Sequence, residues 1–248
     1  MREPPSGFDA FAQSYDEALN RGIRLSGEGK EFFATGRIAW TRQRLGERAA
    51  QVRRVLDFGC GTGTAVPILL EAFPQASVLG VDTSAASLEV ARRAVSDPRA
   101  AFLPLDQLPG AGAFDLVYTN GVFHHIPPGE RAEALAKLAA ALVPAGYLAV
   151  WENNPWNPGT RWVMSRIPFD RDAIPLPPTE ARARVTAAGL EVLGVDFLFF
   201  FPRLLSFLRP YEPWLARIPL GAQYLVLAEV PATSEGGPNE VPATSGPT

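Results

Sequence analysis

The sequence predicts an α/β protein with a mostly parallel, doubly wound sheet that carries helices on both faces. Between residues 52 and 151, short apolar runs of strand character alternate with segments of helical periodicity. One of these runs leads directly into three alternating glycines, a pattern typical of a strand that ends at a ligand site. The length of 248 residues fits one such domain with a small helical cap near the C-terminus.

The composition excludes several classes of function. Hydrophobic residues make up 47% and charged residues 20% of the chain, which is an ordinary globular balance. The net charge is −3 and the basic residues are scattered, so we expect no nucleic-acid partner. Cys60 is the only cysteine, which favours a reducing compartment. Without a signal peptide or a long apolar run, we expect a cytoplasmic protein with no integral membrane segment.

The first 50 residues are predicted to form a helical lead-in. Residues 8–24 and 31–45 each carry apolar side chains at near-helical spacing, and a Gly-rich loop at 26–29 separates them.

The regular alternation follows in the domain predicted over residues 51–230. The pattern predicts strands at 52–58, 77–81, 101–103, 114–119 and 147–151, and helices at 65–73, 84–95 and 130–142.

The rest of the chain is less regular. Two insertions are predicted at 153–178 and 202–220, around a helix at 179–188 and a strand at 190–201. A last strand is predicted at 222–230, and the Pro-, Gly- and Ser-rich tail at 231–248 is expected to be disordered.

The glycine segment at residues 55–63 indicates a ligand that approaches the backbone closely. The following helix offers free N–H groups and a positive dipole end. Nineteen residues beyond Gly63, a second strand ends at Asp82, whose carboxylate can accept both hydroxyl hydrogens of a ribose.

Three ligand classes compete for this loop. A phosphate loop needs Gly-Lys-Ser/Thr, whereas Gly63 is followed by Thr64 and Ala65. A dinucleotide site expects Gly-x-Gly-x-x-Gly, and Asp57 would lie badly beside a pyrophosphate. Because Asp57 suits a ligand with an ammonium and a sulfonium, the pattern favours S-adenosylmethionine over NAD.

The same residues resemble the class I S-adenosylmethionine-dependent methyltransferases of small-molecule type. The run 55–63 is similar to their first motif, and Asp82 matches their ribose-binding acid. Residues 114–117 and 142–148 resemble the motifs at their fourth and fifth strands, so the resemblance covers roughly residues 50–152.

This resemblance implies a seven-stranded sheet with the last strand antiparallel, and S-adenosylmethionine bound at the carboxyl ends of the strands, with S-adenosylhomocysteine as product. Pro104 stands where many relatives have an acid for the adenine, so Asp106 is expected to substitute. The cofactor residues that it implies are Asp57, Gly59, Cys60, Gly61, Asp82, Thr83, Asp106 and Asn120.

His124 and His125 are the candidate catalytic residues, because they follow the fourth strand and a histidine can take a proton at neutral pH. The alternative is that one or both cap the next helix or pack under the loop. No metal site is predicted, since adjacent histidines point in different directions and no third ligand is evident.

The acceptor is expected beside the passage at 151–161, whose amides and indoles suit a polyol, a sugar or an aromatic ring. A folded Ω-like loop is the equal alternative. The candidate acceptor-binding residues are Tyr15, Glu152, Asn153, Trp156 and Arg161.

Residues 197–201, with Tyr211 and Trp214, are interpreted as a core strand followed by a helical cover. A lid over the acceptor and a lipid-contacting surface were the alternatives.

These observations together predict an enzyme that methylates a small molecule, at a hydroxyl if a histidine is the base. An NAD-dependent oxidoreductase and a non-catalytic S-adenosylmethionine-binding relative remain as alternatives. The sequence predicts neither the acceptor nor the oligomeric state.

Overall fold

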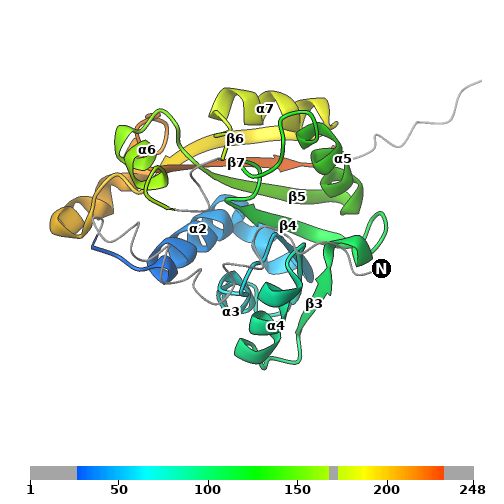
Figure 1. Ribbon diagram of the computed structural model, residues 1–248. Coiled ribbons are helices and arrows are strands. Elements are labelled where there is room, and N and C mark those ends of the chain that lie inside the picture. The colour runs from blue at the N-terminus through cyan, green and yellow to red at the C-terminus, as the bar shows by residue number, and fades with distance from the viewer. Residues whose placement is uncertain (1–26, 168–172, 232–248) are drawn as a thin grey trace, which may run out of the picture.

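A computed structural model describes residues 27–167 and 173–231, which form one seven-stranded sheet covered by helices (Figure 1). The strand order is β3-β2-β1-β4-β5-β7-β6, and β7 runs antiparallel to both of its neighbours. The remaining neighbouring pairs are parallel. The predicted doubly wound fold, with an antiparallel last strand, is therefore confirmed.

The strands are β1 Arg54–Phe58, β2 Ser77–Asp82, β3 Ala100–Pro104, β4 Phe114–Asn120, β5 Leu142–Asn153, β6 Glu191–Leu198 and β7 Gln223–Glu229. The α-helices are α2 Lys30–Leu45, α3 Ala65–Ala72, α4 Ala85–Ala94, α5 Arg131–Ala141, α6 Pro158–Met164, α7 Pro178–Ala187 and α8 Glu212–Leu215. Shorter 3-10 turns are η2 Gly46–Gln51, η3 Leu105–Gln107 and η5 Arg203–Tyr211.

Side-chain alternation along the strands builds two cores, one on each face of the sheet. In β1, Val55 joins a core with α2, α3 and α4, whereas Leu56 joins another with α5 and α7. In β4, Leu116 and Val117 divide in the same way. Because both faces are covered, the central strands are apolar throughout, as expected for parallel strands.

The strand order reverses direction at β1, which lies between β2 and β4. The loops after β1 and β4 therefore leave the sheet toward opposite faces and open a crevice between them at the carboxyl edge. This crevice is where an open α/β sheet binds its ligand.

The predicted helix at 31–45 is present as α2, and it packs on the sheet through Ala34, Ile38 and Leu45. The Trp151 indole donates a hydrogen bond of 3.0 Å to the Thr41 hydroxyl on the same helix face. The segment predicted at 8–24, the tail at 232–248 and the candidate Tyr15 lie outside the described residues.

Two strand boundaries differ from the prediction by three residues or more. β5 begins at Leu142, because that residue pairs with Phe114 before an irregularity restores the register at Leu116. β6 ends at Leu198 and not at residue 201, because Phe199 has a φ of +63° and leaves the extended conformation.

The first insertion contains a short helix, α6, that the sequence pattern did not predict. Asn157 caps it by accepting a hydrogen bond from the N–H of Thr160, and Pro158 occupies the first turn. The buried Asn154 amide donates to the carbonyls of Pro219 and Gly221. The Asn154 amide therefore joins the first insertion to the second by hydrogen bonds.

The second insertion is helical, as predicted, because it forms η5 and α8, and Phe197 and Leu198 before it are buried. Its large apolar side chains Leu204, Phe207 and Trp214 lie exposed, however, and do not cover the core. None of the helices in the described ranges combines the length and apolarity that crossing a membrane requires.

Replacing Asn154 by Ala should destabilise the fold by about 2–4 kcal/mol. The change leaves the buried Gly221 carbonyl, the part-buried Pro219 carbonyl and the Trp156 N–H without their hydrogen-bond partner. Urea unfolding measures this, with Gln43→Ala on the exposed face of α2 as a control that stays within about 0.5 kcal/mol of wild type. Equal midpoints for the two variants would contradict the structural role of the amide.

Candidate functional site

A cleft of about 920 Å³ opens at the carboxyl ends of β1, β2 and β4. This volume lies within the range of small-molecule sites. Its walls include glycine-loop, carboxylate and apolar groups, among them Gly59, Gly61, Asp82, Thr83, Leu105, Asp106, Leu108, Asn120, Val122, His125, Ile126, Glu130 and Lys137. The cleft thus lies at the crevice that the strand order creates.

The glycine loop after β1 needs glycine for two reasons. Gly59 has a φ of +73°, and a Cβ placed there would lie 2.3 Å from the Val122 side chain. The N–H groups of Gly59 and Cys60 donate to the carbonyl of Val81, at 2.8 and 3.0 Å. The loop is therefore fastened to the end of β2 and lies against the loop that follows β4.

Asp82 holds the same loop from the cleft wall. Its carboxylate accepts hydrogen bonds of 2.8 Å from the N–H of Gly61 and from the N–H of Ser84 at the start of α4. Each carboxylate oxygen can accept a further hydrogen bond. Asp82 can consequently fix the loop and receive hydroxyl groups of a ligand at once.

Asp57 lies buried at the end of β1, beneath the glycine loop. Its Oδ2 has no hydrogen-bond partner within the described ranges. Burial raises the pKa of this carboxyl to about 7, the negative charge of Asp82 adds to the rise, and the Arg37 guanidinium opposes it. A buried acceptor without a partner fits a ligand that supplies a cation.

Sequence reasoning missed Arg37, which α2 buries near Asp57. Its Nε donates to the Tyr118 hydroxyl at 3.3 Å, and its Nη1 donates to the Gln223 amide oxygen at 2.9 Å. Gln223 in turn donates to the Asn153 side chain at 3.1 Å. The available signal was a charged residue on the apolar face of a predicted helix.

Cys60 was predicted to bind cofactor, but its thiol points into the protein. Its Sγ lies 2.9 Å from the position that a Cβ on Gly80 would take, and the residue belongs to the core that includes α3 and α4. Burial raises the pKa of the thiol well above its ordinary value. The side chain of Cys60 is therefore not part of the cleft wall, and its backbone N–H is already bonded.

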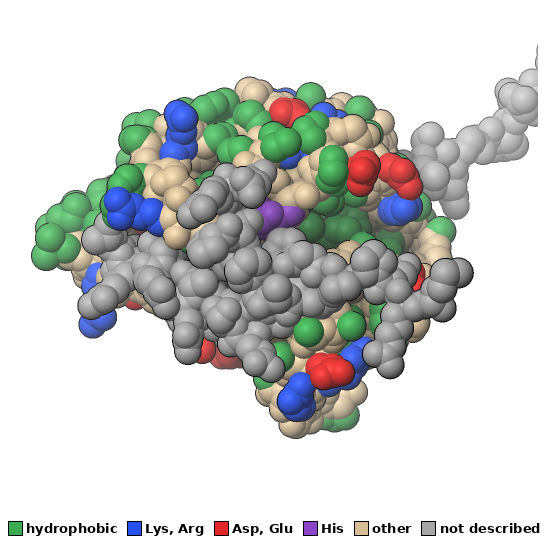
Figure 2. Space-filling model, in the orientation of Figure 1, with side chains coloured by type: hydrophobic (Ala, Val, Ile, Leu, Met, Phe, Trp, Pro, Cys, Tyr) green, Lys and Arg blue, Asp and Glu red, His purple; other side chains and the backbone are tan. Residues whose placement is uncertain are grey.

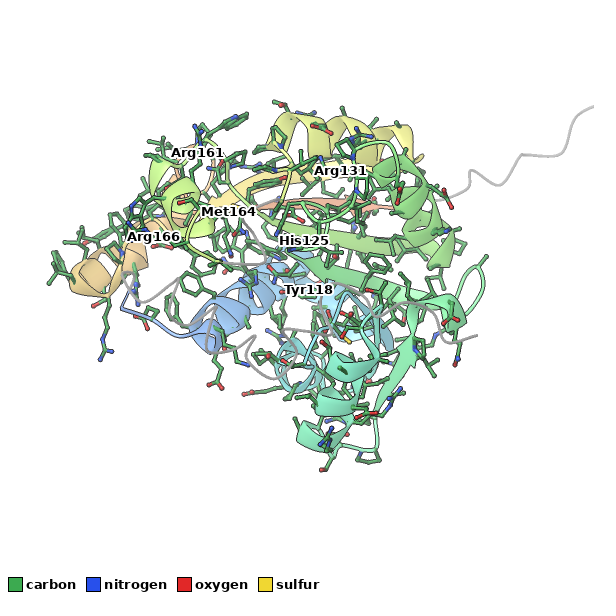
Figure 3. All side chains as sticks on the ribbon, viewed as in Figure 1. Tyr118, His125, Arg131, Arg161, Met164 and Arg166 are labelled. Carbon is green, nitrogen blue, oxygen red and sulfur yellow. The ribbon has the colours of Figure 1, made fainter. Side chains whose placement is uncertain are left out.

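The two histidines occupy different environments. His125 lines the cleft, and Figure 3 shows it at the carboxyl edge near Tyr118. His124 is buried, and its Nδ1 lies 2.6 Å from Glu152 Oε2. Glu152 also accepts a hydrogen bond of 2.7 Å from the N–H of Phe123, so it fixes the whole loop after β4.

The structure thus distinguishes His124 from His125, which the sequence pattern treats as equivalent candidates. The imidazole centroids of His124 and His125 are 4.1 Å apart, so the buried ring supports the one at the cleft. Catalysis by either histidine stays a prediction. Among the predicted cofactor residues, Gly59, Gly61, Asp82, Thr83, Asp106 and Asn120 line the cleft.

The predicted acceptor residues are not brought together at the cleft. Glu152 and Asn153 are hydrogen-bonded to His124 and Gln223, respectively, as described above. Trp156 stacks on Phe197, with ring centroids 6.4 Å apart. Arg161 lies on α6 at the surface (Figure 3). In the described part of the chain none of these four lines the cleft, so their contact with an acceptor stays a prediction.

Comparison with known proteins gives a consistent family assignment. Residues 56–148 match the model of a methyltransferase domain. The chain is 34% identical to trans-aconitate 2-methyltransferase of Methylobacterium nodulans over 164 residues, which are 65% of this chain and 55% of that protein. The chain thus spans about half the length, or less, of the curated relatives it matches.

Solved structures agree in fold. An S-adenosylmethionine-dependent methyltransferase from Archaeoglobus fulgidus superposes with a TM-score of 0.63 at 16% identity, over 90% of this chain and all of the other. The plantazolicin methyltransferase BpumL, solved with S-adenosylhomocysteine, gives 0.63 at 15% identity over 90% and 95% of the two chains. With the glycine loop, Asp82 and the strand order in place, residues 56–148 match a methyltransferase domain, and the chain has the fold of S-adenosylmethionine-dependent methyltransferases.

Proposed function

We propose that this protein transfers the methyl group of S-adenosylmethionine to an oxygen of a small-molecule acceptor. The observation that carries the proposal is the pair of carboxylates at the ends of β1 and β2. Asp57 lies buried with an oxygen that has no partner in the described chain, and Asp82 stands on the cleft wall beside it. Such a pair favours a ligand that is cationic at one end and carries ribose hydroxyls at the other.

The rest of the cleft supports the same ligand. Leu105, Leu108 and Ile126 give an apolar surface that suits a flat base, and Asp106 provides a nearby polar group. Asn120, at the end of β4, offers an amide beside the glycine loop. The relative solved with S-adenosylhomocysteine adds independent support.

S-adenosylmethionine supplies an activated methyl group when it is bound. The protein's own residues then have to orient an acceptor, exclude water and accept a proton where the acceptor carries one. Orientation alone contributes of order 7–11 kcal/mol to the lowering of the barrier in favourable intramolecular systems. Glu152 contacts the His124 ring and accepts a hydrogen bond from the N–H of Phe123, and these buried contacts hold the loop after β4 in place for orienting an acceptor.

His125 is a group on the cleft wall that can accept a proton from a hydroxyl acceptor, because a ring nitrogen of a neutral imidazole is a hydrogen-bond acceptor. A carboxylate acceptor would need no base, since its oxygen is already anionic. The relative from Methylobacterium nodulans is named for trans-aconitate, which makes that compound the first acceptor to assay. Action in the cytoplasm and the absence of a nucleic-acid partner are part of the same proposal, as are the domain bounds at 51 and 230.

Calorimetry should detect binding of S-adenosylmethionine and no binding of NAD. Asp82→Ala should weaken the binding by roughly 1–3 kcal/mol, because the variant loses a charged hydrogen-bond acceptor at the cleft wall. Glu89→Ala, at an exposed position of α4, is the control and should bind like wild type. Binding of NAD alone would overturn the proposed cofactor, and unchanged affinity in the Asp82 variant would refute the ribose assignment.

Affinity for S-adenosylmethionine should rise as the pH increases from 6 to 8. The raised pKa of Asp57, about 7, means that its carboxyl loses a proton in this range and can then attract a cation. Asp57→Asn should bind more weakly and lose this pH dependence. Isothermal titration at three pH values measures both effects, and a wild-type affinity that is flat with pH would contradict the assignment.

The same variant gives a stability readout without ligand. A carboxyl whose pKa is raised by folding stabilises the protein fully below its unfolded pKa of 3.8, and this stability is lost as the pH rises through about 7. The free energy of unfolding of Asp57→Asn, relative to that of wild type, should therefore increase by about 2–3 kcal/mol from pH 5 to pH 8. Urea unfolding at the two pH values measures this difference.

His125→Ala should lower turnover roughly 10²–10⁴-fold with a hydroxyl acceptor, while cofactor affinity stays within about twofold. The acceptor can be found by mass spectrometry of extracts incubated with isotopically labelled donor. His124→Ala is the comparison, because it removes the buried ring and leaves the group at the cleft. Equal turnover of the His125 variant and wild type would mean that this histidine lines the cleft without acting as a base, and would favour a carboxylate acceptor.

A further inference from the structure

The insertion between β6 and β7 carries large apolar side chains on its outside. On η5 and α8, Leu204 is 88%, Phe207 69% and Trp214 80% exposed. Figure 1 shows this segment, in orange, projecting from one end of the sheet, and Figure 2 shows hydrophobic side chains gathered there. Tyr211, Leu205, Ile218 and Leu220 extend the exposed apolar surface along the same insertion. Contiguous exposure of this kind marks an interaction surface.

The exposure is a feature of a folded segment, because Glu212 and Arg209 of the insertion hydrogen-bond to the backbone at the end of β6. The Glu212 carboxylate accepts hydrogen bonds from the N–H groups of Phe199, Phe200 and Phe201, at 3.2, 3.1 and 3.0 Å. Arg209 donates to the Phe201 carbonyl at 3.1 Å. Glu212 and Arg209 therefore face the protein, while the large apolar side chains of the insertion face solvent.

The base of the insertion is fixed to α2. The Phe199 ring packs against Phe33 with centroids 5.0 Å apart, and Gly36 makes room for it, since a Cβ there would lie 2.7 Å from the ring. Arg209 pairs with Glu28 at 2.9 Å and stacks over the Phe32 ring at 4.4 Å. The insertion is thus held as a rigid projection.

Its surroundings are basic although the chain as a whole is acidic. Within residues 199–222, Glu212 is the only acid and is already hydrogen-bonded, while Arg203 and Arg217 are exposed. Arg161 stands on the neighbouring helix α6, and Arg166 lies in the turn that follows it (Figure 3). α6 adjoins the insertion because Asn157, at its N-terminus, donates to the Leu220 carbonyl at 2.6 Å.

We propose that this insertion docks the protein on the surface of an anionic lipid bilayer. Trp, Tyr, Phe and Leu side chains that project outward, with arginines around them, are the composition of a segment that lies in the lipid interface. A twofold contact between two copies would bring Arg161, Arg166 and Arg203 of both copies together. The nearby acids Glu28 and Asp196 are already paired with Arg209 and Arg217. A lipid headgroup layer supplies the negative charge that the insertion itself lacks.

The docking surface and the cleft lie on the same edge of the sheet. β7 is antiparallel to β5 and to β6, so β6 runs parallel to β5 and ends at the carboxyl edge. The insertion that follows β6 therefore leaves the sheet at the edge where the cleft opens. Docking does not depend on the proposed methyl transfer, and the two can be tested separately.

Sedimentation of the full chain with lipid vesicles tests the proposal. Wild type should sediment with vesicles of phosphatidylcholine and phosphatidylglycerol, and less with phosphatidylcholine alone. The triple variant Leu204→Ser/Phe207→Ser/Trp214→Ser should partition roughly tenfold less or weaker still, because three exposed apolar side chains no longer enter the interface. Circular dichroism should show an unchanged fold, since all three side chains are exposed.

Two charge-reversal double variants measure the electrostatic contribution to vesicle binding. Arg161→Glu/Arg203→Glu should reduce sedimentation with the anionic vesicles several-fold. The matched control, Arg93→Glu/Arg182→Glu, changes the same charge on exposed positions of α4 and α7 and should bind like wild type.

Three outcomes would overturn the proposal: no sedimentation of wild type with anionic vesicles, equal sedimentation of wild type and the triple variant, or equal losses in the two charge variants. A wild-type dimer in solution that the triple variant converts to a monomer, without vesicle binding, would assign the surface to a second copy of the chain.

Discussion

The attachment of the glycine loop to the end of β2 is the constraint on which the cleft depends. One carbonyl, that of Val81, accepts two N–H groups of the loop, and the next residue, Asp82, accepts a third from Gly61. These bonds are possible only because the loop adopts positive φ angles at Gly59 and Gly61. Asp82 is thereby held on the cleft wall, while Asp57 lies buried beneath the loop.

The end of β1 beneath this loop is also electrostatically unfavourable for an ionised carboxyl. Asp57 lies at the end of β1, where burial and the charge of Asp82 both disfavour its ionised form. Arg37 offsets part of this cost from α2, but its guanidinium is also hydrogen-bonded to Tyr118 and Gln223. An apolar residue at position 57 would avoid this cost, and the binding role proposed for Asp57 gives a reason for the carboxylate.

The predictable parts of the molecule were those whose role is set by local backbone chemistry. The apolar runs of the central strands, the three glycines and the helix face of α2 each follow from residues close together in the chain. Gly59 is such a residue, because its need for positive φ is visible in the strand–glycine–helix pattern itself.

The unpredicted parts are contacts between residues that are far apart in the sequence. Arg37 and Gln223 are separated by 186 positions, and His124 and Glu152 by 28. No periodicity encodes such pairs, because they depend on how strands and helices are arranged after folding. The sequence therefore located both histidines near the cleft but left open which one lines it and which one Glu152 holds.

The second insertion illustrates a further limit. Its residues have the composition of an amphipathic segment, and the usual inference is that the apolar side faces the protein. Here, the Phe199 backbone leaves the strand at positive φ, and the N–H groups of residues 199–201 would be left without partners in a turn of this shape. Glu212 satisfies all three, which draws the polar side of the insertion inward and turns Leu204 and Trp214 outward. The orientation is thus decided by backbone hydrogen bonding at the end of β6, and hydrophobicity alone would have favoured the opposite one.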